Sequence, residues 1–205
     1  MEHTNKNHWD NVYKTKTSNQ VSWSQAVPKI SLDFIHSFAV DKSAKIIDIG
    51  GGDSNLVDFL LDEGFENITV LDISKNALEK TKKRLGKKGK TIQWIVGDVT
   101  KFIPTTTYDV WHDRATFHFL TSPEDVETYL NIDRRAVVGY LTIGTFSETG
   151  PDKCSGLAIK KYSEEKLLAE LQNGFNKIRC ITENHITPFD TVQQFLFCSF
   201  KRHLS

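Results

Sequence analysis

A short apolar run that ends in an acid and a glycine cluster constrains the fold of this chain more than any other segment. It reads Ile46-Ile47-Asp48-Ile49-Gly50-Gly51-Gly52-Asp53-Ser54. Such apolar runs are typical of buried parallel strands. Because glycine has no Cβ, the cluster lets the main chain turn sharply and approach a ligand closely. Apolar residues then recur at helical spacing over 55–63, so the pattern predicts a strand, a tight turn and a helix.

From residue 45 onward, strand-like runs alternate with helical patterns, and this predicts a parallel sheet covered by helices on both faces. The last two runs are joined by the turn Thr187-Pro188-Phe189-Asp190, which favours an antiparallel hairpin. We therefore expect a doubly wound α/β fold with a seven-stranded, mostly parallel sheet and an antiparallel terminal strand. Ser74 and Ser122 are the expected N-caps of two helices. The expected strands are 45–49, 67–71, 91–96, 110–113, 136–146, 175–183 and 193–200, and the expected helices are 55–63, 74–85, 123–132 and 163–171.

The first 40 residues differ from the alternating pattern, because Trp9, Tyr13 and Trp23 stand among polar residues and a helical pattern follows Pro28. We interpret residues 1–40 as a helical cap on a single domain that spans the whole chain, 1–205. The three aromatic residues either pack the cap onto the domain or form a lid that excludes water from a ligand. Trp23 is the preferred lid residue.

Composition excludes several classes of partner. The chain has 205 residues with 26 basic and 26 acidic side chains, and this balance gives no support to a nucleic-acid or anionic-membrane binder. The N-terminus lacks an apolar signal core, and no run of apolar residues is long enough to cross a membrane. Cys154, Cys180 and Cys198 show no zinc-type spacing, and their odd number argues against a disulfide framework. These features favour a cytoplasmic protein without a bound metal.

Acidic residues follow four successive predicted strands, where ligand contacts occur in open α/β sheets. They are Asp48, Asp72, Asp98 and Asp113. Each alone has an ordinary explanation as a helix cap or turn residue, but together they indicate a nucleotide-type ligand. No Gly-Lys-Ser/Thr follows the glycine cluster, and the spacing G-x-G-x-x-G is absent from it, so phosphate-binding loops are excluded. A cationic ligand that carries an adenosine ribose fits the acids better.

These segments resemble three motifs of the class I S-adenosylmethionine-dependent methyltransferases. Residues 48–54 resemble the first motif, D/E-x-G-x-G-x-G, with Ser54 in place of the last glycine. Residues 70–74 resemble the second motif, whose acid binds the ribose hydroxyls, and residues 97–99 resemble the third, which contacts the adenine. The resemblance implies a Rossmann-like fold, S-adenosylmethionine as methyl donor and S-adenosylhomocysteine as product. The implied cofactor-binding residues are Asp48, Gly50, Gly51, Gly52, Asp72, Ile73, Asp98, Val99, Asp113 and Trp23.

A narrower resemblance concerns the acceptor of the methyl group. Residues 9–13 and 22–23, together with the segment His112-Asp113-Arg114-Ala115, are similar to small thiopurine- and thiol-type methyltransferases. The second segment equally resembles a group of protein-lysine methyltransferases, and Ala115 replaces a glycine of both. We therefore expect methyl transfer to a small nucleophile such as a thiol or a related heteroatom compound. The alternatives are a protein-lysine methyltransferase and a non-catalytic cofactor-binding partner subunit.

Methyl transfer is an in-line displacement at a sulfonium carbon, so the protein mainly aligns the nucleophile. A general base is needed only when the nucleophile arrives protonated. His112, Asp113 and His118 are the predicted candidates for that role, although His118 also fits the start of the next helix. The loop 147–156 follows the fifth strand on the substrate side, where Cys154 either contacts substrate or serves as a small apolar residue.

Overall fold

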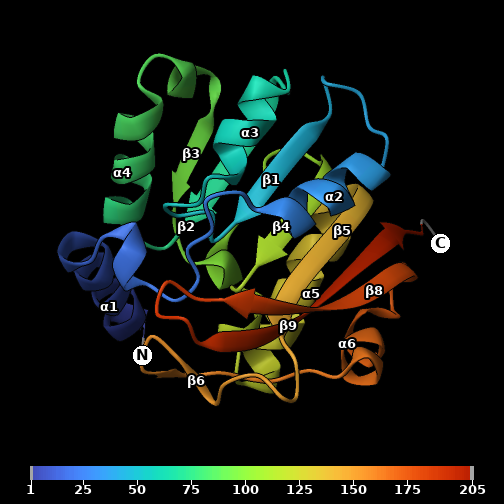
Figure 1. Cartoon of the computed structure of the whole chain (residues 1–205). Coiled ribbons are helices and arrows are strands. Elements are labelled where there is room, and N and C mark those ends of the chain that lie inside the picture. Colours follow the sequence, from blue (N-terminus) through green and yellow to red (C-terminus); the bar gives the residue numbers. More distant parts are fainter. Residues whose placement is uncertain (1, 204–205) are drawn as a thin grey trace.

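Seven strands form the central sheet, in the order β3-β2-β1-β4-β5-β9-β8 (Figure 1). The computed structural model describes residues 2–203. All neighbouring pairs from β3 to β5 are parallel, whereas β9 runs antiparallel to both β5 and β8. This confirms the predicted fold. The strands are β1 (Lys45–Ile49), β2 (Asn67–Asp72), β3 (Gln93–Val96), β4 (Tyr108–Arg114), β5 (Val137–Phe146), β8 (Phe175–Ile186) and β9 (Val192–Arg202), with a separate small hairpin of β6 (Lys153–Cys154) and β7 (Leu157–Ala158).

Helices cover both faces of the sheet, as alternating βα units require (Figure 1). The α-helices are α1 (Glu2–Thr15), α2 (Lys29–Ser37), α3 (Leu56–Asp62), α4 (Lys75–Leu85), α5 (Pro123–Ala136) and α6 (Glu164–Leu171), and four short 3₁₀ turns are η1 (Ser18–Gln20), η2 (Lys88–Thr91), η3 (Val99–Lys101) and η4 (Phe117–Phe119). Phe34 of α2, Leu60 of α3 and Leu78 of α4 share one buried cluster. Tyr129 of α5 and Leu171 of α6 belong to the cluster on the other face. Both faces of the strands are therefore apolar.

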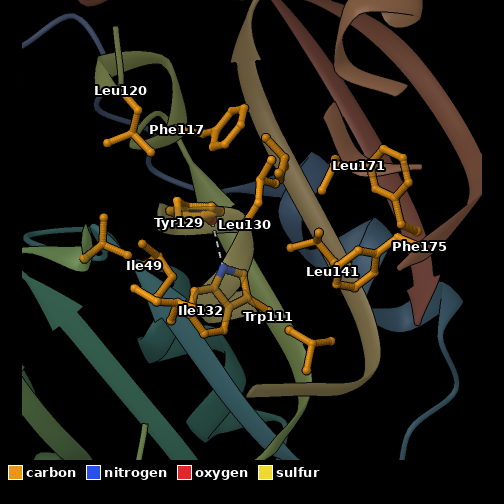
Figure 2. Close-up of a cluster of buried hydrophobic side chains, with 14 of the residues drawn as sticks. Ile49, Trp111, Phe117, Leu120, Tyr129, Leu130, Ile132, Leu141, Leu171 and Phe175 are labelled. Atoms are coloured by element: carbon orange, nitrogen blue, oxygen red, sulfur yellow. Dashed lines mark hydrogen bonds between the residues drawn. The ribbon is translucent and has the colours of Figure 1, made fainter. Parts of the chain in front are cut away.

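The cluster beneath α5 and α6 contains the largest buried side chain, Trp111 (Figure 2). Its indole Nε1 donates a hydrogen bond to the hydroxyl of Tyr129 at 2.8 Å, and the two rings meet edge to face. A buried indole needs such a partner, because an unpaired N–H would keep the cost of leaving water. Trp111 alternates along β4 with His112, whose side chain points to the opposite face of the sheet.

The predicted N-caps are confirmed, since the side chains of Ser74 and Ser122 accept hydrogen bonds from Ala77 N and Asp125 N. The hairpin strands β8 and β9 extend further than predicted, toward the turn at 187–191. Their added residues are polar or exposed, so apolar periodicity does not reveal them.

The prediction of no disulfide was wrong for two of the three cysteines. Cys180 of β8 and Cys198 of β9 face each other in the hairpin register and are joined by a disulfide, while Cys154 is a buried free thiol. Cysteine count and spacing miss such a pair, because strand register decides which residues stand opposite. Within residues 2–203, no helix is long and apolar enough to span a bilayer.

Candidate functional site

A cavity of about 210 Å³ opens at the carboxyl ends of the parallel strands, beneath α1 and the segment that follows it. The structure brings most of the predicted site residues to the wall of this one cavity: Asp48, Gly50, Gly51, Asp72, Ile73, Asp98, Val99, His112 and Trp23. Gly52 lies beside the wall. Asp113 and His118 are not among the lining residues of the described chain. Four neighbouring strand ends therefore meet at one site, as expected of an open α/β sheet.

The glycine loop after β1 has no room for side chains. Gly50 and Gly52 adopt positive φ values of 66° and 41°, which favour glycine. A Cβ at Gly51 would lie 2.5 Å from Asp48 Oδ2, and a Cβ at Gly52 would lie 2.8 Å from Asp72 Oδ2. The backbone thus lies directly against two acidic side chains. This is the close approach that a nucleotide-type ligand requires of a loop.

Asp72 ends β2 and is buried, with one carboxylate oxygen accepting a hydrogen bond from Ser74 N at 2.7 Å. Burial raises the pKa of Asp72 to about 7, and the nearby charges of Asp48 and Asp10 add to the effect. Hydrogen bonds donated by a ligand, such as those of a ribose diol, would stabilise this buried carboxylate. Its geometry and electrostatics therefore fit the predicted ribose contact.

Asp48 and His112 form a buried polar pair in the wall of the cavity. His112 Nδ1 donates to Asp48 Oδ1 at 2.7 Å, and His112 Nε2 lies 2.8 Å from the hydroxyl of Ser31 in α2. Both ring nitrogens are therefore engaged, so His112 holds Asp48 in place rather than offering a free base. The second oxygen of Asp48 has no hydrogen-bond partner within the described residues. Such an orphan acceptor beside the glycine loop is available to a ligand that donates hydrogen bonds.

Asp98 follows β3 and caps the turn η3, because its Oδ1 accepts from both the backbone N and the hydroxyl of Thr100 at 2.9 Å and 2.8 Å. Capping and ligand contact are compatible here, since Asp98 also lines the cavity together with Val99. The ordinary explanation of this acid is thus correct for one oxygen. The predicted contact between Asp98 and an adenine is compatible with this cap.

Asp113 lies on the face of β4 turned away from the cavity wall. Its Oδ1 accepts from Thr116 N and Phe117 N, and its Oδ2 accepts from the hydroxyl of Tyr129 at 2.8 Å. Burial raises the pKa of Asp113 to about 6. The side chain is fully buried and fixes the turn after β4, so the structure gives no support to its predicted roles as a base and as a cofactor contact.

His118 is completely buried in an apolar environment. Its ring stacks on Phe146 at 4.6 Å and contacts Phe119, and neither nitrogen finds a hydrogen-bond partner among the described residues. Burial lowers the pKa of His118 to about 3, helped by the charge of Arg114. A neutral imidazole in this environment packs like an aromatic side chain. The surroundings of His118 therefore fit the alternative interpretation, in which it packs at the start of the next turn and takes no part in catalysis.

The N-terminal aromatic residues converge on the cavity. Trp9 contacts Tyr13, Trp23 and Phe119, with ring centroids 6.2, 5.5 and 5.3 Å away. All four line the cavity. These contacts fit the packing interpretation, and the position in the cavity wall is compatible with the lid interpretation, which stays a prediction. Tyr13 was not a predicted cofactor residue, yet its hydroxyl would lie 3.0 Å from a Cβ at Gly52.

The wall opposite the acids comes from β4, β5, β9 and the small hairpin. It includes Arg114, Phe146, Phe195 and Cys154. The guanidinium of Arg114 lies over the ring of Phe195 at 5.2 Å, and its Nη1 donates to the carbonyl of Trp23 at 3.0 Å. Burial raises the pKa of Cys154 to about 12, so its thiol stays neutral. The cavity thus has an acidic half over β1–β3 and an aromatic half that contains the buried Arg114, whose charge is stabilised by those of Glu183 and Asp48.

A family model described as a methyltransferase domain matches residues 46–137. The matched segment starts in β1 and ends where β5 begins, so it contains the glycine loop and the acids at 48, 72 and 98. Residues 46–137 are therefore similar to a methyltransferase domain, in agreement with the predicted resemblance to class I S-adenosylmethionine-dependent methyltransferases. The close-packed loop, Asp72 and the orphan oxygen of Asp48 fit S-adenosylmethionine, the cofactor that the comparisons support.

Two curated methyltransferases share part of this sequence. The eEF1A lysine and N-terminal methyltransferase of Mus musculus is 24% identical over 128 residues, which cover 62% of this chain and 18% of that protein. The malonyl-(acyl-carrier protein) O-methyltransferase of Anoxybacillus flavithermus is 32% identical over 124 residues, which cover 58% of this chain and 47% of that protein. The match therefore spans less than half of each relative.

Solved structures show the same methyltransferase fold. A protein studied for the conversion of a disulfide bond into a thioacetal group during echinomycin biosynthesis gives a TM-score of 0.76 at 16% identity, over 96% of this chain and 92% of that one. The 1,6-didemethyltoxoflavin-N1-methyltransferase of Burkholderia thailandensis gives a TM-score of 0.72 at 15% identity, over 98% of this chain and 85% of that one. That structure was solved with S-adenosylhomocysteine bound. At these identities the likeness concerns the fold alone.

Proposed function

We propose that this chain transfers a methyl group from S-adenosylmethionine to a small, soft nucleophile such as a thiol or a related heteroatom compound. The observation that carries the proposal is the contrast between the two halves of the cavity. The acids that line it lie at or just beyond the carboxyl ends of β1, β2 and β3 or in the first turn of α5, whereas β4, β5 and β9 contribute Arg114, Phe146 and Phe195. An acceptor bound on the second side meets aromatic rings and a buried cation.

The charge of Arg114 discriminates between acceptors. Burial lowers the pKa of Arg114 to about 10, so the guanidinium still carries its charge at neutral pH. A buried cation disfavours a second cation, such as the ammonium of a lysine, and favours the ionised form of a thiol. Aromatic walls add contact with a polarisable or apolar acceptor and keep water away from it.

The residues of the acidic half would hold the cofactor, which supplies an electrophilic methyl carbon on a sulfonium. Asp72 is placed to accept hydrogen bonds from a ribose, and the loop 50–52 allows close approach of the ligand. Asp98 and Val99 also line the cavity, and we assign the adenine to them. Trp9, Tyr13 and Trp23 would exclude water. Orientation and desolvation are the main contributions expected from such a site.

Protein-lysine methylation is the second candidate, and sequence similarity is what favours it. Relatives named as eEF1A lysine methyltransferases share 24% identity with this chain in Mus musculus and 30% over 135 residues in Danio rerio. Against it stands the buried Arg114 at the acceptor side. A non-catalytic cofactor-binding subunit is the third candidate. A cytoplasmic location stays a prediction.

The test is a transfer assay with S-adenosylmethionine labelled in the methyl group. The purified chain is incubated with cell lysate, the products are separated into small molecules and macromolecules, and a panel of thiols and amines is assayed in parallel. Label in the small-molecule fraction and on thiols is expected. Label on a polypeptide would overturn the first candidate in favour of the second, and cofactor binding without any transfer would favour the third. Asp72→Ala, which should not bind the cofactor, is the control.

A further inference from the structure

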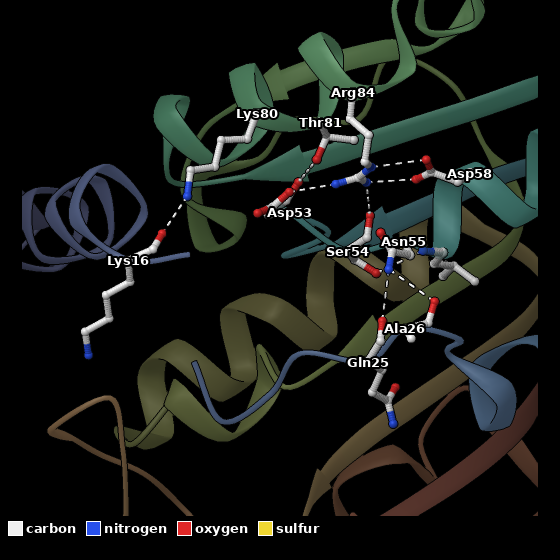
Figure 3. Close-up of polar contacts among 12 residues, drawn as sticks. Lys16, Gln25, Ala26, Asp53, Ser54, Asn55, Asp58, Lys80, Thr81 and Arg84 are labelled. Carbon is white, nitrogen blue, oxygen red and sulfur yellow. Dashed lines mark hydrogen bonds and ion pairs between the residues drawn. The ribbon is translucent and has the colours of Figure 1, made fainter. Parts of the chain in front are cut away.

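Arg84, in the last turn of α4, binds the segment that follows the glycine loop (Figure 3). Arg84 is not among the described residues that line the cavity. Its Nη1 donates to Asp53 Oδ1 at 2.7 Å, and its Nη2 donates to the carbonyl oxygen of Ser54 at 2.7 Å. The same guanidinium binds both carboxylate oxygens of Asp58 in α3, at 3.1 Å and 2.8 Å. One side chain therefore joins α4, the loop and α3.

A second contact from α4 reaches the loop one turn earlier. The hydroxyl of Thr81, which is buried, donates to the carbonyl oxygen of Gly52 at 2.8 Å (Figure 3). Thr81 and Arg84 are three residues apart, so they lie on the same face of the helix. Together they hold the backbone carbonyls of residues 52 and 54 and the side chain of Asp53 between them.

The loop needs this support because its own sequence makes it adaptable. Glycine loses more conformational freedom on ordering than any other residue, and three glycines stand in a row here. The N–H and the hydroxyl of Ser54, where the family motif has its last glycine, make only local bonds: its N donates to Gly51 O, and its Oγ accepts from Leu56 N. These bonds shape the start of α3 but do not fix the loop against the rest of the domain.

Arg84 also balances a charge at the cavity. Asp53 lines the cavity, and its partner Arg84 is about one-third exposed. Burial alone would lower the pKa of Arg84, but the ion pairs with Asp58 and Asp53 outweigh it and raise that pKa. The guanidinium therefore stays charged, and its planar fork suits two carboxylates and a carbonyl at once.

We propose that Arg84 is a positioning residue for the cofactor: it fixes the glycine loop in its binding conformation and thereby sets the affinity for S-adenosylmethionine and S-adenosylhomocysteine. The inference rests on the assignment of the cavity as the cofactor site. It gives a residue outside the cavity control over cofactor affinity, with no contact to the acceptor side.

Binding of S-adenosylhomocysteine to the purified apo chain, measured by calorimetry, tests this proposal. Arg84→Ala is expected to raise the Kd about tenfold, as loss of charge-assisted hydrogen bonds does. Arg84→Lys should recover part of that loss, because the lysine ammonium can replace some of the hydrogen bonds that the guanidinium donates. Lys82→Ala is the matched control: Lys82 lies on the same helix and pairs with Glu79 at 2.9 Å, away from the loop. Turnover at saturating cofactor should be unchanged in all three.

Each variant is compared at a temperature where circular dichroism shows it fully folded, so a purely structural role would leave the Kd unchanged. If Arg84→Ala does not fold, Thr81→Val removes the other contact from the same helix face, and its Kd should rise about threefold. A Kd within twofold of the parent for both variants would overturn the proposal, as would an equal loss in Lys82→Ala. Failure of the parent chain to bind either cofactor form would instead refute the cofactor assignment itself.

Discussion

Gly50 is the position in the cofactor loop where a side chain finds least room, so Gly50→Ala is a sharp test of the site. The residue has φ +66°, a left-handed conformation that L side chains disfavour. A Cβ built there would lie 1.8 Å from Thr116 Oγ1, and 3.2 Å from the Cβ of the same threonine. Alanine at this position must therefore bear backbone strain and displace the segment after β4.

The two effects can be sized separately. A left-handed conformation costs about 1–2 kcal/mol for a residue with a Cβ. An overpacked contact costs about 1–3 kcal/mol. We therefore expect Gly50→Ala to lower the free energy of unfolding by about 2–5 kcal/mol. Gly64→Ala is the matched control, because Gly64 has φ +86° and its added Cβ meets no heavy atom of residues 2–203 within 4 Å beyond Gly64 and its two chain neighbours, so it bears only the strain.

Urea unfolding followed by circular dichroism measures these free energies, and calorimetry measures the affinity for S-adenosylhomocysteine. Gly50→Ala should lose cofactor binding, whereas Gly64→Ala should keep it. Adding Thr116→Ala to Gly50→Ala removes the clashing oxygen, so the double variant should recover part of the overpacking cost, and a double-mutant cycle isolates that part. The reasoning would be refuted if Gly50→Ala and Gly64→Ala were equally stable, or if Gly50→Ala bound the cofactor normally.

Three further predictions follow from buried groups. Burial raises the pKa of Asp72 to about 7, so the apo fold should lose stability as pH rises from 3.8 to about 7; Asp72→Asn should reduce this slope in urea melts and abolish cofactor binding. His118→Leu should keep cofactor binding and turnover, because the ring packs as a neutral side chain; a tenfold loss of turnover would restore its predicted catalytic role. Alkylation without reductant, followed by mass spectrometry, should find Cys180 and Cys198 joined and Cys154 protected until unfolding; three free thiols would contradict the structure.

The acidic half of the cavity could be predicted from the sequence because each of its acids lies at or just beyond the carboxyl end of a strand. Parallel strands end at the same edge of a sheet, so residues that follow β1, β2 and β3 must meet. Asp48, Asp72 and Asp98 accordingly share the cavity. The same logic failed for Asp113, whose side chain turns to the other face of β4. Alternation along a strand decides which face a residue occupies, and a position at the strand end does not reveal it.

The aromatic half could not be predicted in the same way, because its residues come from segments that are distant in the chain. Trp9, Phe146 and Phe195 meet only once α1 has packed against α4 and the terminal hairpin has joined the sheet. Arg84 was equally hidden, since a basic run on a helix usually reads as a solvated face. Strand register and helix docking are long-range properties, and local periodicity carries little information about them.

The fates of the three predicted bases bear on the kind of acceptor. His112 is held between Asp48 and Ser31, Asp113 is saturated by Tyr129 and the backbone, and His118 is enclosed by aromatic rings. A nucleophile in this cavity must therefore lose its proton without help from any of them. A thiol, with a pKa of about 8.5, does so more readily than a lysine amine at about 10.4. A buried guanidinium lowers the pKa of a thiol and of an ammonium alike, but it attracts only the thiolate that the thiol forms and repels the ammonium before it loses its proton. The same features that remove the predicted bases thus favour a soft nucleophile as the methyl acceptor.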